Sequence, residues 1–298
     1  MELRWFADPE AFLAHATPML AEHEAENNLP LGIAGSLARD PRRPGAAPPY
    51  LATVDTDGAP VAAAVMTPPS RLILARTFYP ASLDMLAADV RARYGTLPGV
   101  LAPAPLGHDF AARWQRLTGQ PARPGRTHRG YRLAAVTPPA SVTGRLRRAV
   151  AADRALLIDW LTAFDVEESG VADRAAARQM VDNRLASTTS AFYLWDDGQP
   201  VSLTGYYGPT PHGIRIGPVY TPPAWRRRGY ASACVAAVSQ LLLDGGRRFC
   251  ALSTDRANVT SNHVYQAIGY QPVCDIEEYD FGGSASAEPG GQAAGRVI

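Results

Sequence analysis

The stretch VYTPPAWRRRGYA, residues 219–231, joins an apolar strand to a long helix. Gly229 opens this helix without a side chain, so backbone amides at the positive end of the helix stay uncovered. A pyrophosphate can approach such amides closely, and Arg226, Arg227 and Arg228 add positive charge beside them. The stretch therefore predicts an anion-binding turn between a strand and a helix. A helix start with a solvated basic turn is the alternative interpretation of the same residues.

The periodicity around this turn predicts a mixed α/β layered domain in the second half of the chain. Asp-Gly and Gly-Gly pairs mark its turns and helix ends. We expect strands over 144–148, 191–195, 201–207, 214–220 and 249–253, helices over 152–164, 174–185, 229–243 and 259–268, and one or two further strands over 270–281.

A short sequence occurs twice, as DGAPV at 57–61 and as DGQPV at 197–201, at an offset of 140 residues. In each copy an Asp-Gly turn is expected to join two strands into a hairpin. An amphipathic stretch precedes each hairpin, over 9–24 and over 152–167. Asp-Gly turns are common, so chance is the alternative, but the shared order and offset favour a duplicated domain. Proline-rich residues 137–141 mark the linker.

The first half repeats this order without the anion-binding turn. Residues 72–75 and 99–102 are expected strands, 110–117 an expected helix, and 130–136 the last strand. No glycine opens a helix after residues 77–80, so no second anion-binding turn is expected. We divide the chain into a first domain without this turn, a second domain that contains it, and a disordered Gly-, Ala- and Ser-rich tail. Their bounds are 1–138, 139–282 and 283–298.

Composition limits the functional classes. The 298 residues are 46% hydrophobic and 19% charged, without a long apolar run or a signal peptide, so we expect a cytoplasmic protein with no membrane contact. All 29 basic residues are arginine and the net charge is +1. They are too scattered for nucleic-acid binding. Cys234, Cys250 and Cys274 lack zinc-site spacing, and free thiols and no metal are expected.

A second motif follows the first at a set distance. Asn258 begins an expected helix, Tyr265 lies seven residues later, and Gly269-Tyr270 ends it. Together the two segments resemble the GNAT superfamily of N-acetyltransferases, whose first signature is matched by Arg226, Gly229 and Ala231. This resemblance implies two tandem GNAT-like domains, each a mixed central β-sheet flanked by helices. The domain over 1–138 is then a degenerate copy, without a cofactor site, and the domain over 139–282 is the catalytic one. It also implies acetyl-CoA as the cosubstrate.

The resemblance carries roles to particular residues. Tyr265 matches the tyrosine that acts as general acid; a core tyrosine with its hydroxyl satisfied elsewhere is the alternative. Asn258 could equally be a helix N-cap, and Asp255 and Asn262 could be simple turn and helix-surface residues. The residues expected to bind the cofactor are Val219, Tyr220, Thr221, Arg226, Arg227, Arg228, Gly229, Tyr230, Ala231, Ser232, Asn258 and Asn262.

The expected reaction is direct attack of an amine on acetyl-CoA. The general base is not identified by the sequence: Asp165, Glu167, Glu168 and His212 are candidates, and water or a neutral amine could replace them. The acceptor stays open among a small amine, an aminoglycoside-like compound, an amino acid and a peptide N-terminus. We expect the first half to cover or shape the acceptor pocket. The alternatives are a coenzyme A-binding sensor or structural protein without turnover, and an α/β protein that binds no nucleotide.

Overall fold

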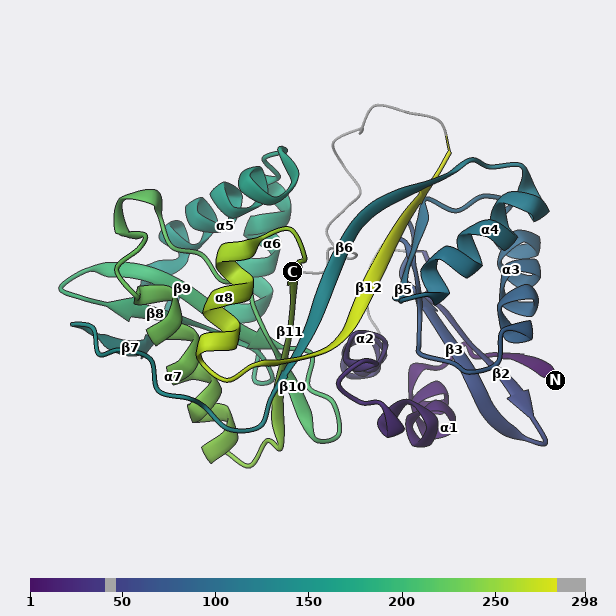
Figure 1. Cartoon of the computed structure of the whole chain (residues 1–298), viewed down its shortest axis with the longest axis horizontal. Coiled ribbons are helices and arrows are strands. Elements are labelled where there is room, and N and C mark those ends of the chain that lie inside the picture. The colour runs from purple at the N-terminus through teal and green to yellow at the C-terminus, as the bar shows by residue number, and fades with distance from the viewer. Residues whose placement is uncertain (41–46, 283–298) are drawn as a thin grey trace. The chain divides into compact units, whose positions relative to one another are not determined.

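A computed structural model describes residues 1–40 and 47–282 (Figure 1). Contacts divide them into two compact units. The first unit contains residues 1–130 and 253–257, together with the described residues from 272 onward, and the second contains 131–252 and 258–271. The expected tail, 283–298, lies outside the described residues.

The first unit is a sheet between two pairs of helices. Its strands follow the order β1-β2-β3-β4-β5-β12. The helices α1 and α2 cover one face through Leu51 and Val65, and α3 and α4 cover the other through Ala52 and Ala64. This alternation is the two-residue period of a strand buried on both faces. The bounds are β1 (Glu2–Trp5), α1 (Pro9–Glu22), α2 (Asn28–Arg39), β2 (Tyr50–Thr56), β3 (Ala59–Met66), β4 (Leu72–Leu74), α3 (Ala81–Tyr94), β5 (Gly99–Pro103), α4 (Leu106–Thr118) and β12 (Gln271–Phe281).

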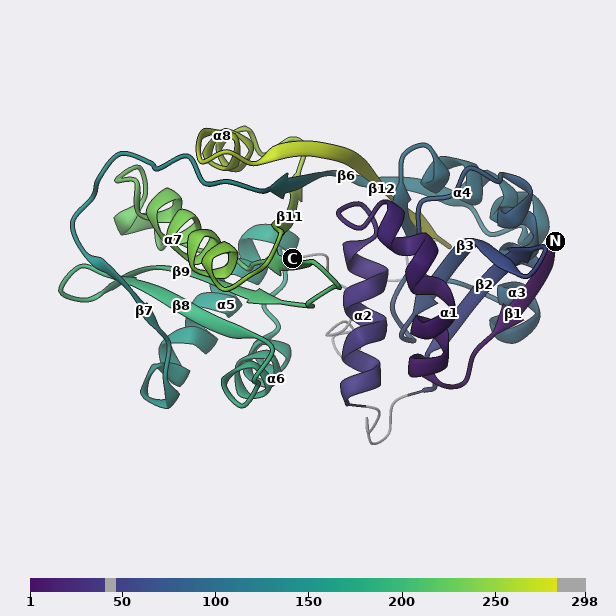
Figure 2. The same ribbon diagram turned by 90° about the horizontal axis from the view of Figure 1, so that it is seen from below.

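The second unit has the same layers. Its strands follow the order β11-β10-β9-β8-β7, with α5 and α6 on one face and α7 and α8 on the other (Figure 2). The strand β6 (Ala122–Leu133) begins in the first unit and ends in the second. The remaining bounds are β7 (Arg145–Arg148), η1 (Ala151–Asp153), α5 (Arg154–Ser169), α6 (Arg174–Leu185), β8 (Ala191–Asp196), β9 (Pro200–Tyr207), β10 (Gly213–Ile216), η2 (Pro223–Trp225), α7 (Tyr230–Asp244), β11 (Phe249–Asp255) and α8 (Val259–Ala267).

The internal repeat is visible in the structure. Both Asp-Gly turns close hairpins, β2–β3 and β8–β9, and each hairpin shifts register just before its turn, at Val54/Asp55 and at Trp195/Asp196. Each hairpin continues into an antiparallel strand, then a helix, then a parallel strand. The repeated order β4-α3-β5 and β10-α7-β11 makes the two units comparable element by element.

Several elements differ from the sequence expectation. The helices α2 and α3 and the strand β1 were not anticipated, and β6 begins at Ala122 rather than near residue 130. The last strand, β12, pairs antiparallel with β5 through Ile276–Asp280. The compact units therefore do not follow a simple division at residue 138. Residues 137–141 lie outside helices and strands, as expected. No helix within the described ranges has both the length and the hydropathy to cross a membrane.

Candidate functional site

The antiparallel pairing of β9 with the chain after β10 contains one extra residue. Backbone pairs flank it: Gly217 N donates to Gly205 O at 2.9 Å, and Tyr220 and Leu203 exchange two hydrogen bonds of 2.9 and 2.8 Å. The chain thus advances three residues from 217 to 220 while its partner advances two, from 205 to 203. This is a β-bulge, which bends a strand and leaves a residue unpaired. It explains why β10 ends at Ile216 rather than at the expected Tyr220.

Val219 lies inside this bulge. Pro218 before it has no N–H, and the amide of Tyr220 is used by Leu203. No acceptor for the amide of Val219 occurs within residues 1–40 and 47–282. Val219 and Tyr220 were both expected to bind the cofactor; of their two amides, that of Val219 is available to a ligand, whereas that of Tyr220 is used within the sheet.

The turn before α7 presents further amides. Arg226 N donates to Pro223 O at 3.3 Å, and Ala233 N donates to Gly229 O at 3.0 Å. Between these two bonds, the amides of residues 227–232 find no acceptor in the part of the chain that the structure describes. No side chain caps α7. A row of uncommitted amides at a helix start is a binding site for an anion, because the helix dipole places positive charge there.

Gly229 gives this turn its shape. Its φ is 83°, a left-handed conformation that other residues adopt only at a cost. A Cβ built on Gly229 would lie 2.9 Å from Cγ1 of Val142, which is closer than real contacts allow. Glycine is therefore required both by the backbone conformation and by the space beside it.

The three arginines of the turn differ in their contacts. Nη2 of Arg226 donates to both carboxylate oxygens of Glu167, at 2.6 and 2.7 Å, and its Nε donates to Thr221 O at 2.8 Å. The guanidinium of Arg228 stacks on Trp225 at 5.0 Å. Neither Arg227 nor Arg228 forms an ion pair with any described residue. Their charges are thus available to an anion, whereas Arg226 connects the turn to the end of α5.

Tyr230 connects the same turn to the β8–β9 hairpin. Its hydroxyl donates to Oδ2 of Asp197 at 2.6 Å. Thr143 donates to the same carboxylate at 2.7 Å, and the two bonds lower the pKa of Asp197. Ala231 and Ser232, which follow Tyr230, are half-buried. Tyr230 therefore serves the turn through its side chain, while Ala231 and Ser232 contribute amides.

The corresponding turn of the first unit, between β4 and α3, is closed. Tyr79 N donates to Oγ1 of Thr77 at 3.1 Å, Ser82 N to Tyr79 O at 3.0 Å, and Leu83 N to Pro80 O at 3.1 Å. These local acceptors occupy the amides that the turn of the second unit leaves open. Three amides of this turn are thus bonded to local acceptors, in contrast to the amides of the turn before α7.

Tyr265, on α8, is 8% exposed, and its ring packs against Tyr131 and Tyr270 at 6.3 and 6.0 Å. Its hydroxyl forms no hydrogen bond with any described residue, in contrast to a core tyrosine satisfied by its surroundings. Burial raises the pKa of Tyr265, and the negative charge of Glu168 raises it further. The phenol is therefore protonated at neutral pH and can donate its proton.

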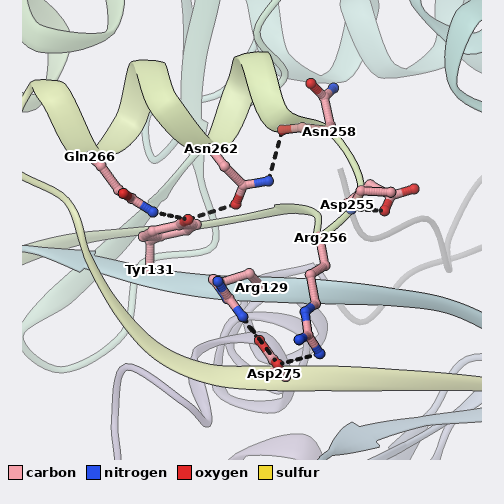
Figure 3. Close-up of polar contacts among 9 residues, drawn as sticks. Arg129, Tyr131, Asp255, Arg256, Asn258, Asn262, Gln266 and Asp275 are labelled. Atoms are coloured by element: carbon pink, nitrogen blue, oxygen red, sulfur yellow. Dashed lines mark hydrogen bonds and ion pairs between the residues drawn. The ribbon is translucent and has the colours of Figure 1, made fainter.

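A polar network fixes α8 in place (Figure 3). The hydroxyl of Tyr131 donates to Oδ1 of Asn262 at 2.6 Å and accepts from Nε2 of Gln266 at 3.0 Å. Nδ2 of Asn262 donates to Asn258 O at 2.8 Å. Both ends of the Asn262 side-chain amide thus have partners inside the fold. Sequence reasoning missed Tyr131 and Gln266, because neither belongs to a recognised motif.

Two of the simpler alternatives hold for the neighbouring residues. Oδ1 of Asn258 accepts from Ser261 N at 3.0 Å, which makes it the N-cap of α8. Oδ1 of Asp255 accepts from Ala257 N at 2.8 Å, as expected for a turn residue. Oδ1 of Asn258 is thus used by the helix cap. A contact of Asn258 with a cofactor stays a prediction.

The four residues that are candidates for the general base differ in their contacts and burial. Glu167 is paired with Arg226, and Asp165 is buried at 7% exposed. Only Glu168 among the four candidates contributes to the raised pKa of Tyr265. His212, before β10, accepts through its backbone oxygen from Arg248 N at 2.9 Å. Glu168 is thus the carboxylate whose charge acts on Tyr265.

The cysteines of the described part of the chain form no disulfide bonds. Cys234 and Cys250 are buried and Cys274 is half-buried. Burial raises the pKa of both Cys234 and Cys250 to about 12, so their nucleophilic thiolate forms are scarce at neutral pH. Residues 1–40 and 47–282 contain no group of three or more His, Cys, Asp or Glu side chains placed to hold a metal ion.

The second half of the chain matches a known protein family. A profile of the acetyltransferase (GNAT) family matches residues 155–270. No curated protein sequence matches the chain.

Three solved structures resemble nearly the whole chain. A Drosophila protein aligns at a TM-score of 0.62 and 16% identity, covering 94% of this chain and 98% of its own. A tandem GNAT protein from the clavulanic acid biosynthesis pathway aligns at a TM-score of 0.59 and 13% identity, covering 96% of this chain and 100% of its own. A GCN5-related N-acetyltransferase from Sphaerobacter thermophilus aligns at a TM-score of 0.57 and 19% identity, covering 93% of this chain and 94% of its own. At these identities the likeness establishes a shared fold.

Proposed function

Because residues 155–270 form a GNAT acetyltransferase domain, we propose that this domain transfers the acetyl group of acetyl-CoA to an amine by direct attack. The observation that carries the proposal is the row of amides at residues 227–232 that have no acceptor among the described residues. A pyrophosphate supplies the negative oxygens that such a row binds, and Arg227 and Arg228 supply counter-charge.

The bulge and Tyr265 supply the two hydrogen bonds that the reaction needs. The amide of Val219 would donate to the thioester carbonyl oxygen as negative charge develops there. The amine nitrogen forms a bond to the carbonyl carbon and loses a proton to Glu168 or water. The carbon–sulfur bond then breaks, and Tyr265 gives its proton to the departing sulfur. The products are an amide and the free coenzyme A thiol.

The test combines binding with turnover. We expect wild type to bind acetyl-CoA by calorimetry and to acetylate at least one member of a broad amine panel. Tyr265→Phe should keep the binding and lose turnover, because the phenol acts only on the leaving group. The half-exposed Tyr94 of the first unit provides the matched control, since Tyr94→Phe removes a hydroxyl far from this chemistry in sequence.

The outcomes separate the candidate functions. Binding without turnover of any amine would favour a coenzyme A sensor over an enzyme. Equal turnover by wild type and Tyr265→Phe would remove Tyr265 from the mechanism. Failure to bind acetyl-CoA would refute the proposed function as a whole.

A further inference from the structure

Arg184, on α6, is a buried cation without an anionic partner. Its side chain is 9% exposed, and burial lowers its pKa to about 10, so it remains charged at neutral pH. Nη1 donates to Gly217 O at 2.8 Å. No carboxylate of residues 1–40 or 47–282 forms an ion pair with it, and Gly217 O is the one hydrogen-bond acceptor that these residues offer. A guanidinium carries five N–H donors, so most of its donors await a partner.

The surroundings hold this guanidinium without neutralising it. Its carbon lies 4.3 Å from the ring centre of Phe192 and 4.9 Å from that of Tyr207. Gly205, which pairs with Phe192, makes room for it: a Cβ there would lie 3.1 Å from Nη1. Aromatic faces attract a cation but accept none of its in-plane hydrogen bonds. The edge of the guanidinium therefore stays available.

A second buried arginine lies on the same face of the sheet. Arg215 is 1% exposed, and its Nε donates to the hydroxyl of Tyr207 at 3.0 Å. Ile214 and Ile216 flank Arg215 in β10 and belong to the core cluster of α7 and α8, so Arg215 points to the opposite face, which α5 and α6 cover. The ring of Tyr207 thus contacts both guanidinium groups, that of Arg184 at 4.9 Å and that of Arg215 at 5.6 Å.

Burial of an unpaired charge is costly, and an apolar residue of similar volume packs at lower cost. An arginine at such a position points to an anion that the protein binds. Its place in the chain indicates which one: Gly217, which Arg184 contacts, precedes Val219 by two residues, a span of at most about 7 Å. An anion on Arg184 would therefore lie within one small molecule of the proposed acetyl carbonyl.

We infer that Arg184 binds the carboxylate of the acceptor, so that the amine substrate is an amino acid or another small carboxylate-bearing amine. This inference rests on the proposed acetyl transfer and specifies its substrate class. The planar fork of a guanidinium matches a carboxylate through two parallel hydrogen bonds. Arg184 is a specificity residue in this scheme, because it touches the acceptor away from the reacting nitrogen.

The experiment compares each common amino acid with its own carboxamide as acceptor, following release of the coenzyme A thiol. Amidation removes the negative charge and keeps the amine. It also lowers the amine pKa, which increases the neutral, nucleophilic form and so biases the comparison against the inference. For the preferred side chain, we expect kcat/KM of wild type to be at least about tenfold higher for the acid than for the amide.

The variant Arg184→Gln can still donate to Gly217 O but carries no charge. We expect the ratio of acid to amide to fall to about one in this variant, because turnover of the acid falls more than turnover of the amide, while affinity for acetyl-CoA is retained. Arg184→Lys should recover part of the preference. The matched control is Arg178→Gln, on the same helix, where the arginine is exposed.

Three results would overturn the inference. They are acetylation only of amines that lack a carboxylate, a wild-type ratio near one, and an equal loss of both activities in Arg184→Gln. The last result would mean that Arg184 only holds the strand at Gly217. Absence of acetyl-CoA binding would instead refute the proposed function itself, so the two failures are distinguishable.

Discussion

The substitution Gly229→Ala tests the row of amides before α7. Gly246, at the other end of the same helix, provides the matched control, because its φ is 93° and a Cβ there would meet nothing within 4 Å. Alanine at either position costs about 1–2 kcal/mol for the left-handed conformation. The backbone cost should therefore lower the free energy of unfolding by a similar amount in both variants. Gly229→Ala should lose somewhat more, because its new methyl group crowds Val142.

Ligand linkage should separate the two variants. Acetyl-CoA at a hundred times its Kd should stabilise wild type by about 2.7 kcal/mol. If the new methyl at Gly229 costs one charge-assisted hydrogen bond to the phosphate, of about 1.5 kcal/mol, Kd rises roughly tenfold. At the same concentration of acetyl-CoA, the stabilisation of Gly229→Ala then falls to about 1.4 kcal/mol. Gly246→Ala should keep the full 2.7 kcal/mol.

The assay is chemical denaturation of the three proteins with and without acetyl-CoA. It measures the intrinsic cost and the ligand contribution in the same experiment. Equal stabilisation of Gly229→Ala and Gly246→Ala by acetyl-CoA would refute the reasoning, because it would mean that the phosphates do not approach the chain at Gly229.

Further predictions concern the side chains around this turn and α8. Tyr265→Phe should lower kcat by about 10²–10⁴-fold in steady-state kinetics. It should change the free energy of unfolding little in denaturation, because the hydroxyl of Tyr265 has no hydrogen-bond partner among the described residues. Burial and the charge of Glu168 raise the pKa of Tyr265, so its hydroxyl should stay protonated, and kcat should be maintained, up to high pH. A loss of kcat below about pH 10 that depends on Tyr265 would contradict this assignment. Glu168→Gln removes a negative charge and should move the fall of kcat at high pH to a lower pH. Tyr131→Phe should destabilise the protein by about 1–3 kcal/mol in urea denaturation, because it leaves Oδ1 of Asn262 without its donor. Arg226→Gln should cost under about 1 kcal/mol in the same assay, because the ion pair it breaks is exposed, and a larger loss would show that this pair organises the turn.

Local patterns predicted local structure well. The Asp-Gly pairs gave both hairpins, and the helix expected over 174–185 coincides with α6. The helix α2 was missed because it contains Pro30, Gly32 and Gly35, which all have low helix propensity. All three are buried, so tertiary packing overrides propensity there.

The site was predictable only where a motif is continuous in sequence. The turn around Gly229 is such a motif, and its backbone conformation follows from the glycine. Tyr131 lies far from Asn262 in the chain, and only the fold brings their side chains together. Nothing in the sequence marked Arg184 as a site residue, because an arginine on an amphipathic helix is normally exposed. Its burial depends on Phe192 in β8 and Gly205 in β9, which the fold places beside it.

The position of β12 has a consequence for the synthesis of the protein. The strand β5 lies between β4 and β12, yet β12 ends at Phe281. A ribosome that has completed β5 must add roughly 170 more residues, which takes on the order of 10–30 s, before β12 can emerge. During that interval the nascent first unit exposes an unpaired apolar edge strand, the kind of surface that recruits other strands. The chain thus depends on its last strand to protect its first half, and premature termination after the second unit would release an aggregation-prone product.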